Sequence, residues 1–168
     1  MFVLDHVAVL TDSLEREIVD HSEWTPGPIE TFEAEGTREV YLGNDGRPKL
    51  LFLQAIGDGP YRNAEQKRGC GLHHVCFKTA DIEKGLNALN GSGWRMHRCS
   101  ITTFRTSKTV WLIHSDAKFL VELHAADARE VSGVQFIAPA SERAATPLGL
   151  TAGSSLELRV GENLFSLP

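Results

Sequence analysis

Two adjacent histidines occur in the segment GLHHVCF, residues 71–77. The apolar, β-forming residues that follow the histidines predict a buried strand. Because neighbouring strand residues point to opposite faces of a sheet, His73 and His74 cannot serve the same purpose. Imidazole nitrogens bind divalent metals, so one member of the pair is a candidate metal ligand.

An internal repeat distinguishes the two histidines. Residues 4–18, LDHVAVLTDSLEREI, align without a gap on residues 72–86, LHHVCFKTADIEKGL. In this alignment His6 falls on His74, and Asp5 falls on His73. Strand alternation puts His6 and His74 on the face opposite the bulky apolar residues, which suit a face covered by helices. The two histidines would converge if the copies pair about a pseudo-twofold axis, and a metal site is the hypothesis that follows.

A carboxylate also stands within an apolar run. Glu122 lies in KFLVELH, between Val121 and Leu123. A carboxylate is costly to bury unless it is paired or bound to a metal. Glu122 is therefore a candidate third ligand, and the alternative is a strand-edge residue that faces water.

Each copy of the repeat predicts the same elements. A strand (3–10 or 72–79) leads through a cap at Thr11/Asp12 or at Asp81 into an amphipathic helix. Gly91-Ser92-Gly93 signals the end of the second helix. Three strand-like runs follow each helix, and Asn44-Asp45-Gly46 signals a hairpin turn in the first copy. These runs are PIETFEAE, REVYLGN and KLLFLQA in the first copy and WRMHRCSIT, TVWLIHS and KFLVELHA in the second.

The order βαβββ, found twice, predicts an α+β fold. We expect two βαβββ modules that form a cupped mixed sheet with helices on its outer face, followed by a C-terminal strand/hairpin extension. The expected boundaries are 1–56 for the first module, 57–70 for a linker, 71–126 for the second module and 127–168 for the extension. The extension, with a hairpin around Gly161-Glu162-Asn163, is either a degenerate third repeat or a cover for a sheet edge.

With these elements in place, residues 2–126 resemble the vicinal oxygen chelate superfamily. The segments GLHHVCF and FLVELH carry the resemblance most specifically, and the chain is most similar to methylmalonyl-CoA epimerase and glyoxalase I-like proteins. The resemblance implies one divalent metal (zinc, cobalt, nickel, manganese or iron) held by residues of the first and last strands of each module. It implies His6, His74 and Glu122 as ligands, with Glu122 also counted among the catalytic residues.

The fourth ligand departs from the family pattern. The resemblance places Leu51 of KLLFLQA where a glutamate or glutamine is expected. Gln54 has the opposite strand parity and would need a bulge to reach the metal. Three interpretations stay open: three protein ligands with water, a shifted site that uses Gln54, or a site that has lost its metal.

The resemblance implies an enzyme that stabilises an enolate next to a carbonyl. An epimerase, isomerase or glyoxalase-type lyase would act in this way on a small acid joined to CoA or to another thiol. Glu39 of GTREVYL falls where some epimerases carry a catalytic glutamate, and Glu35 is a nearby substitute. The alternatives are a non-catalytic, resistance-type binding protein, which Leu51 favours, and an extradiol-type dioxygenase, whose two-histidine, one-glutamate ligand count is present.

Bulk properties exclude several classes of partner. The 168 residues carry a net charge of −5 with scattered lysines and arginines, which argues against nucleic-acid binding. No apolar run approaches the ~20 residues of a membrane span, and the N-terminus lacks the features of a signal peptide. Three cysteines without a CxxC motif predict free thiols and a cytoplasmic location. Exposed sheet edges and the C-terminal hairpin favour a homodimer.

Overall fold

The structure is a computed structural model that describes residues 2–127, 129 and 132–167. It divides into two compact units. His6–His73 form one, here called the N-terminal unit, and Met1–Asp5 with His74–Pro168 form the other, the C-terminal unit. The division falls within two strands, β1 (Val3–Leu10) and β5 (Gly71–Thr79), each of which contributes to both units.

The N-terminal unit contains one βαβββ set and a further helix. Its strands lie in the order β2-β3-β4-β1, with β1 parallel to β4 and the other neighbours antiparallel. The turn at Asn44–Gly46 joins β3 to β4, as predicted. Besides β1, the elements are α1 (Leu14–Asp20), β2 (Glu30–Phe32), β3 (Thr37–Leu42), β4 (Lys49–Ala55) and α2 (Pro60–Arg68).

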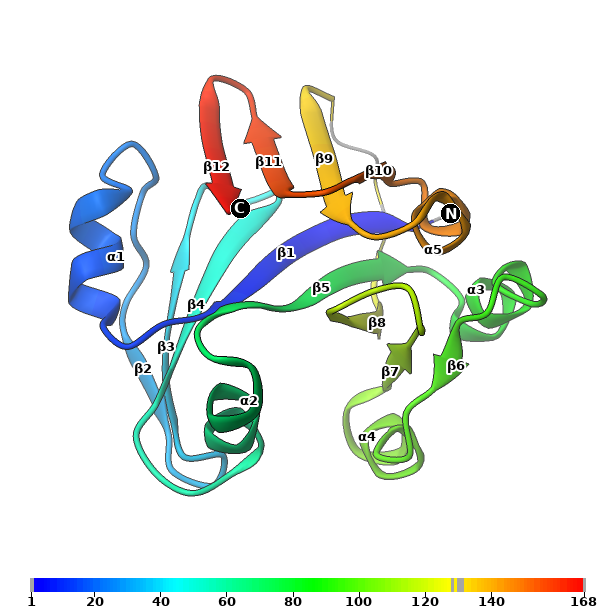
Figure 1. Cartoon of the computed structure of the whole chain (residues 1–168), viewed down its shortest axis with the longest axis horizontal. Helices are drawn as coiled ribbons and strands as arrows, with labels where there is room; N and C mark the ends of the chain where they lie inside the picture. The colour runs from blue at the N-terminus through cyan, green and yellow to red at the C-terminus, as the bar shows by residue number, and fades with distance from the viewer. Residues whose placement is uncertain (1, 128, 130–131, 168) are drawn as a thin grey trace. The chain divides into compact units, whose positions relative to one another are not determined.

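Helices cover both faces of this sheet (Figure 1). α1 lies on the face of Phe52, whose ring stacks on His21 at the end of α1. α2 lies on the other face, where Tyr61 and Ala64 pack on an apolar cluster of β1 and β4 that includes Leu51. α2 occupies the segment expected to be a linker, and no helix was predicted there.

The C-terminal unit repeats the βαβββ order. Its first sheet runs β5-β8-β7-β6, with β5 parallel to β8 and the other neighbours antiparallel. α3 spans residues that lie 68 positions after those of α1, so the repeat seen in the sequence is structural. Besides β5, the elements are α3 (Ile82–Ala88), β6 (Arg95–Met96), α4 (Ser100–Ser107), β7 (Thr109–Ile113) and β8 (Leu120–Ala125).

The C-terminal extension forms a second sheet, ordered β10-β9-β11-β12, as a strand/hairpin extension predicts. The β11–β12 hairpin turns at Gly161 and Glu162, with Val160 paired to Asn163. Residues 128, 130, 131 and 168 of the predicted extension lie outside the described residues. The elements are β9 (Val134–Pro139), α5 (Glu142–Ala145), the 3-10 helix η1 (Thr146–Leu148), β10 (Thr151–Gly153), β11 (Leu156–Val160) and β12 (Asn163–Leu167). The predicted α+β class, with two βαβββ modules and this extension, is confirmed.

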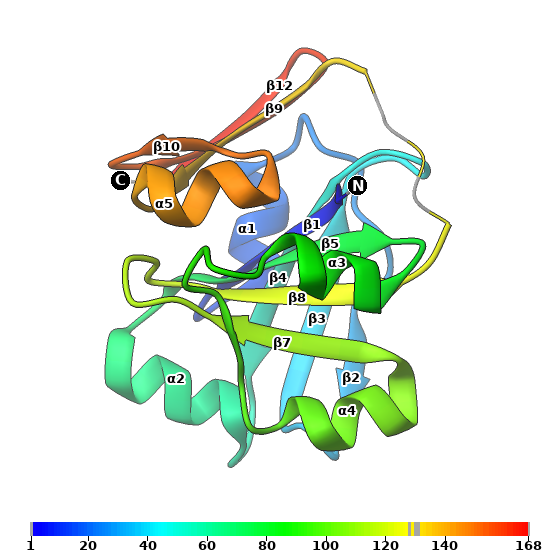
Figure 2. The same cartoon turned by 90° about the vertical axis from the view of Figure 1, so that its right-hand side faces the viewer.

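The prediction of a strand over WRMHRCSIT is wrong beyond its first residues. Only the two residues of β6 pair with β7, and the chain then forms α4 beside that strand (Figure 2). The Ser100 hydroxyl donates to the Trp111 carbonyl at 2.8 Å, and the Thr103 hydroxyl donates to the Thr109 carbonyl at 2.8 Å. Hydroxyl groups of the helix therefore bond backbone carbonyls at the edge of β7 that a neighbouring strand would otherwise bond.

The caps of the two repeat helices differ. Asp81 caps α3 as predicted, because its carboxylate accepts the Lys84 N–H at 3.0 Å. The cap of α1 is Ser13, whose hydroxyl accepts the Arg16 N–H at 3.2 Å, and not Thr11 or Asp12. Among the described helices, none has the length and apolarity needed to cross a membrane.

Candidate metal and catalytic site

His74 and Glu122 meet in the C-terminal unit. The His74 Nε2 atom lies 3.5 Å from the Glu122 Oε2 atom, and the two side chains are buried and largely buried, respectively. Glu122 is the cross-strand partner of both Cys76 on β5 and Trp111 on β7, which places all three on the face of His74. The adjacent, parallel strands β5 and β8 thus bring an imidazole and a carboxylate together inside the fold.

An ion pair and a thiol lie near His74 and Glu122. Lys78, which follows Cys76 on the same face of β5, forms an ion pair with Asp5 at 2.5 Å. Burial raises the pKa of the Cys76 thiol well above its usual value, and the Glu122 and Asp5 carboxylates raise it further. Cys76 is therefore a neutral thiol beside the Glu122 carboxylate.

His6 occupies the equivalent place in the N-terminal unit. Its ring meets Tyr41 of β3 edge-on, with centroids 5.4 Å apart and planes at 88°. In the C-terminal unit the His74 ring meets Trp111 of β7 edge-on, at 5.0 Å and 83°. Each repeat therefore holds its histidine against an aromatic ring from the same strand of the module. Sequence reasoning missed these two rings as histidine supports, because ring-edge packing has no spacing signal.

Strand register identifies the counterpart of Glu122. Glu122 pairs with Cys76, and in the repeat Cys76 corresponds to Ala8. Ala8 pairs with Leu51 on β4, so Leu51 holds the position that Glu122 holds in the second module. Leu51 packs in the apolar cluster under α2. The N-terminal unit therefore supplies a histidine but no carboxylate at this position.

Gln54 lies on the other face of β4 from Leu51. Its side-chain oxygen accepts a hydrogen bond from Arg38 at 3.1 Å, and its nitrogen donates to the Asp12 carbonyl at 2.7 Å. Both ends of the amide are thus engaged on the side of the sheet that faces α1.

Glu39 lies on the same face of the N-terminal unit as His6. It pairs with Leu53, which pairs with Leu10, and Leu10 shares strand parity with His6. Burial raises the pKa of the Glu39 carboxyl, opposed by a 3.1 Å hydrogen bond from Thr37 and reinforced by the nearby Glu35. A half-buried carboxylate with a raised pKa has the properties of a proton acceptor.

His73 has different surroundings from His74. It is buried in the N-terminal unit, with its ring 5.1 Å from that of Tyr61 on α2. Burial lowers its pKa to about 4, and the Arg68 charge adds to the shift. His73 therefore has a buried, structural position.

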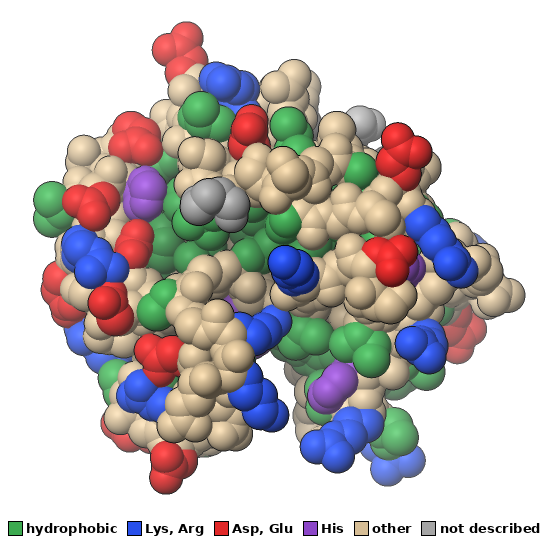
Figure 3. All heavy atoms as spheres, in the orientation of Figure 1, with side chains coloured by type: hydrophobic (Ala, Val, Ile, Leu, Met, Phe, Trp, Pro, Cys, Tyr) green, Lys and Arg blue, Asp and Glu red, His purple; other side chains and the backbone are tan. Residues whose placement is uncertain are grey.

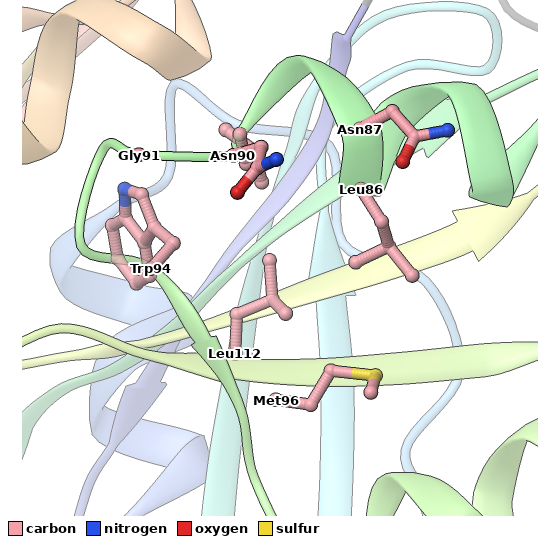
Figure 4. Close-up of a pocket in the computed structure, with 8 residues that line it drawn as sticks. Leu86, Asn87, Asn90, Gly91, Trp94, Met96 and Leu112 are labelled. Carbon is pink, nitrogen blue, oxygen red and sulfur yellow. The ribbon is translucent and has the colours of Figure 1, made fainter.

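A cavity of about 340 Å³ lies elsewhere in the C-terminal unit (Figure 4). Leu86 on α3 and Leu112 on β7 point toward each other across it, and Trp94 closes one side. Leu112 lies on the face of β7 opposite Trp111, so the cavity opens on the helix-covered side of the sheet. None of the predicted site residues lines it.

Comparisons with known proteins identify the fold as that of the methylmalonyl-CoA epimerases. Similar structures include a Streptomyces coelicolor methylmalonyl-CoA epimerase variant in complex with 2-nitronate-propionyl-CoA, at 21% identity and a TM-score of 0.52, covering 75% of this chain and 100% of that one. The Mycobacterium tuberculosis epimerase is 21% identical with a TM-score of 0.51, over 74% of this chain and 89% of that one.

A hypothetical protein of Bacillus halodurans, BH1468, also shares the fold. It is 20% identical with a TM-score of 0.58, over 76% of this chain and 98% of that one. No protein-family model matches the sequence, and a search of curated proteins gives no significant match. The likeness to these structures confirms the predicted fold.

Proposed function

We propose that this chain is an epimerase-like enzyme that moves a proton next to a carbonyl with the help of a divalent metal. The observation that carries the proposal is the pairing of His74 with Glu122 at 3.5 Å inside the fold. A carboxylate in such a place is costly unless it binds a cation or forms hydrogen bonds.

We assign the metal to His6, His74 and Glu122. Two imidazoles with a carboxylate are a common donor set for divalent metals. The 3.5 Å between the His74 and Glu122 atoms suits two ligands that each lie about 2.1 Å from one ion. When bound, the ion supplies Lewis-acid stabilisation of the oxyanion that forms beside the carbonyl. Gln54 is left out of this set, because Arg38 and the Asp12 carbonyl already engage its amide.

Glu39 is the proposed general base. It lies on the face of His6, and its raised pKa makes it a stronger proton acceptor than an exposed glutamate. The base must be ionised to accept a proton, so activity should fall as the pH drops through its raised pKa. We therefore expect activity to be lost on acidification at a pH above the usual pKa of a glutamate side chain.

Deuterium exchange tests the proposal. Methylmalonyl-CoA, the ligand of a structurally similar epimerase, is incubated in D₂O with the metal-loaded protein, and incorporation next to the carbonyl is followed. Glu39→Gln should lower the exchange rate by about 10²–10⁴-fold. Glu33→Gln, on the exposed turn of the same hairpin, should exchange at the unmodified rate. An absence of exchange with the unmodified protein, or equal rates for both variants, would contradict the assignment.

One observation favours a second candidate function. The apolar packing of Leu51 under α2 is what a non-catalytic, small-molecule-binding relative without a fourth ligand would show. In that case the protein would bind a CoA thioester without exchanging its proton. The exchange experiment separates the two functions, provided that binding is measured alongside it.

We also propose a cellular location and an oligomeric state. All three cysteines are free, with Cys70 exposed and Cys76 buried, which agrees with the proposed reducing, cytoplasmic location. We propose a homodimer, as the sequence predicts, and a small-molecule substrate joined to CoA or to another thiol.

A further inference from the structure

The end strands of the two units carry opposite charge. β2 ends the strand order of the N-terminal unit, and β6 ends that of the C-terminal unit. An end strand leaves a row of backbone N–H and C=O groups without a strand partner. The charge and size of its side chains therefore determine which molecules can bind at this edge. Residues 12–35, which include β2, contain eight acidic residues and one arginine, whereas residues 84–115, which include β6, contain five basic residues and no acidic one.

The basic edge consists of exposed residues in and next to β6 and α4. Lysine and arginine side chains gather over this end of the C-terminal unit (Figure 3). None of its cations forms an ion pair with a described residue, and only Lys108 has a ring contact, with Phe104 at 5.2 Å. Three large apolar side chains lie among them, exposed by 38–68%. Its members are Arg95, Met96, Arg98, Ile101, Phe104, Arg105 and Lys108.

The acidic edge consists of exposed residues of β2, the residue before it and the turn that follows it. Ile29 and Phe32 expose 38% and 41% of their surface, and Glu30, Glu33 and Glu35 surround them. None of the three carboxylates forms an ion pair with a described residue. Glu30 also lies directly opposite Glu39 in the strand pairing, and like charges in such a pair destabilise a sheet. A cation that approaches this edge would relieve the repulsion.

We propose that the acidic edge of one copy binds the basic edge of a second copy of this chain. Each edge repels its own kind, and each attracts the other through complementary charge around a small apolar centre. A second copy is favoured over an unrelated partner because the chain itself carries both surfaces, unpaired and at the ends of its sheets. When two copies form this contact twice, with the acidic edge of each copy on the basic edge of the other, the result is the proposed homodimer. It does not depend on the proposed metal chemistry.

Charge reversal in pairs tests the contact. Sedimentation equilibrium of the full chain gives the association constant at low salt. Arg98→Glu with Arg105→Glu, or Glu33→Arg with Glu35→Arg, should each lower this constant by about tenfold. Mixing the two variants should restore the association constant, because an acidic edge again meets a basic one.

Salt gives a second test. Raising the salt from about 0.1 to about 1 M shortens the Debye length from about 10 to about 3 Å and should dissociate the unmodified protein. Arg159→Glu, at an exposed position of β11, is the control and should leave association unchanged.

Three results would overturn the proposal. The first is a monomer at every concentration and salt. The second is an oligomer that neither reversal weakens, which would place the interface elsewhere. The third is a failure of the mixed variants to associate, although circular dichroism shows both to be folded. If the basic edge binds vesicles of anionic phospholipid while the chain does not self-associate, that edge has a membrane partner and the proposal is likewise wrong.

Discussion

His73 and His74 are neighbours in the chain but have separate chemical environments. His74 lies beside a carboxylate that a metal could share, whereas His73 packs on Tyr61 with its pKa lowered to about 4. Strand alternation is the reason, because it turns the two side chains to opposite faces. We therefore expect His73 to affect the stability of the fold and His74 to affect its chemistry.

The pKa of His73 predicts a pH dependence of stability. As the pH falls from 6.5 to about 4, the unfolded chain binds a proton at His73 that the folded chain does not, so the free energy of unfolding decreases. The full effect is about 3 kcal/mol. His73→Gln should flatten this part of the curve in urea unfolding followed from pH 7 to pH 4. A His73→Gln slope equal to that of the unmodified protein would contradict the assignment.

At the residue scale, the sequence suggests the proposed ligands but not the aromatic rings that contact two of them. His6 and His74 could be found because the repeat aligns them, and Glu122 because a carboxylate interrupts an apolar run. Tyr41 and Trp111 could not be assigned to them, since only the pairing of β3 with β4 and of β7 with β8 brings each ring to its histidine.

At the scale of elements, one turn ties the C-terminal extension to the second module. The Trp94 indole donates to the Ala144 carbonyl of α5 at 2.9 Å, and the Arg143 Nε donates to the Ser92 carbonyl at 3.2 Å. The His114 ring, buried beside this turn, also bonds the Ser92 carbonyl at 3.1 Å. Gly93 has a positive φ of 102° here, and a Cβ would come within 2.5 Å of the His114 Nε2 atom.

Gly93→Ala should therefore destabilise the protein. A residue with a side chain is strained at this φ, and its methyl group would also displace His114, for a total cost of about 2–4 kcal/mol. Gly91→Ala is a matched control, because Gly91 also has a positive φ, of 80°, but has no atom within 4 Å of the added Cβ. Urea unfolding of both variants should show the larger loss for Gly93→Ala. Equal losses would mean that backbone strain alone acts at this turn.

Elements in register with the repeat were predictable, and those outside it were not. α1 and α3 lie at the repeat offset and have the expected strand before them. α4 was missed because its Ile and Thr residues favour strands, whereas its Ser100 and Thr103 hydroxyls bond the edge of β7. α2 was missed because Gly57 and Pro60 indicate a linker, and a proline is also tolerated in the first turn of a helix.

At the scale of the whole molecule, two βαβββ units share a scaffold but differ in what they contribute. Each supplies a histidine held by an aromatic ring, and only the C-terminal unit supplies a carboxylate at the equivalent strand position. The N-terminal unit has Leu51 there and contributes Glu39 as the proposed base. Duplication followed by this divergence would give one metal site with three protein ligands and a position open to substrate.

Metal analysis of the purified chain tests this claim most directly. The protein is reconstituted in turn with zinc, cobalt, nickel, manganese and iron, freed of excess metal, and measured by elemental analysis. We predict one ion per chain for the unmodified protein and for His97→Ala, and a loss of bound metal for His74→Ala and Glu122→Gln. Less than stoichiometric metal in the unmodified protein after every reconstitution, or full retention by both site variants, would contradict the account.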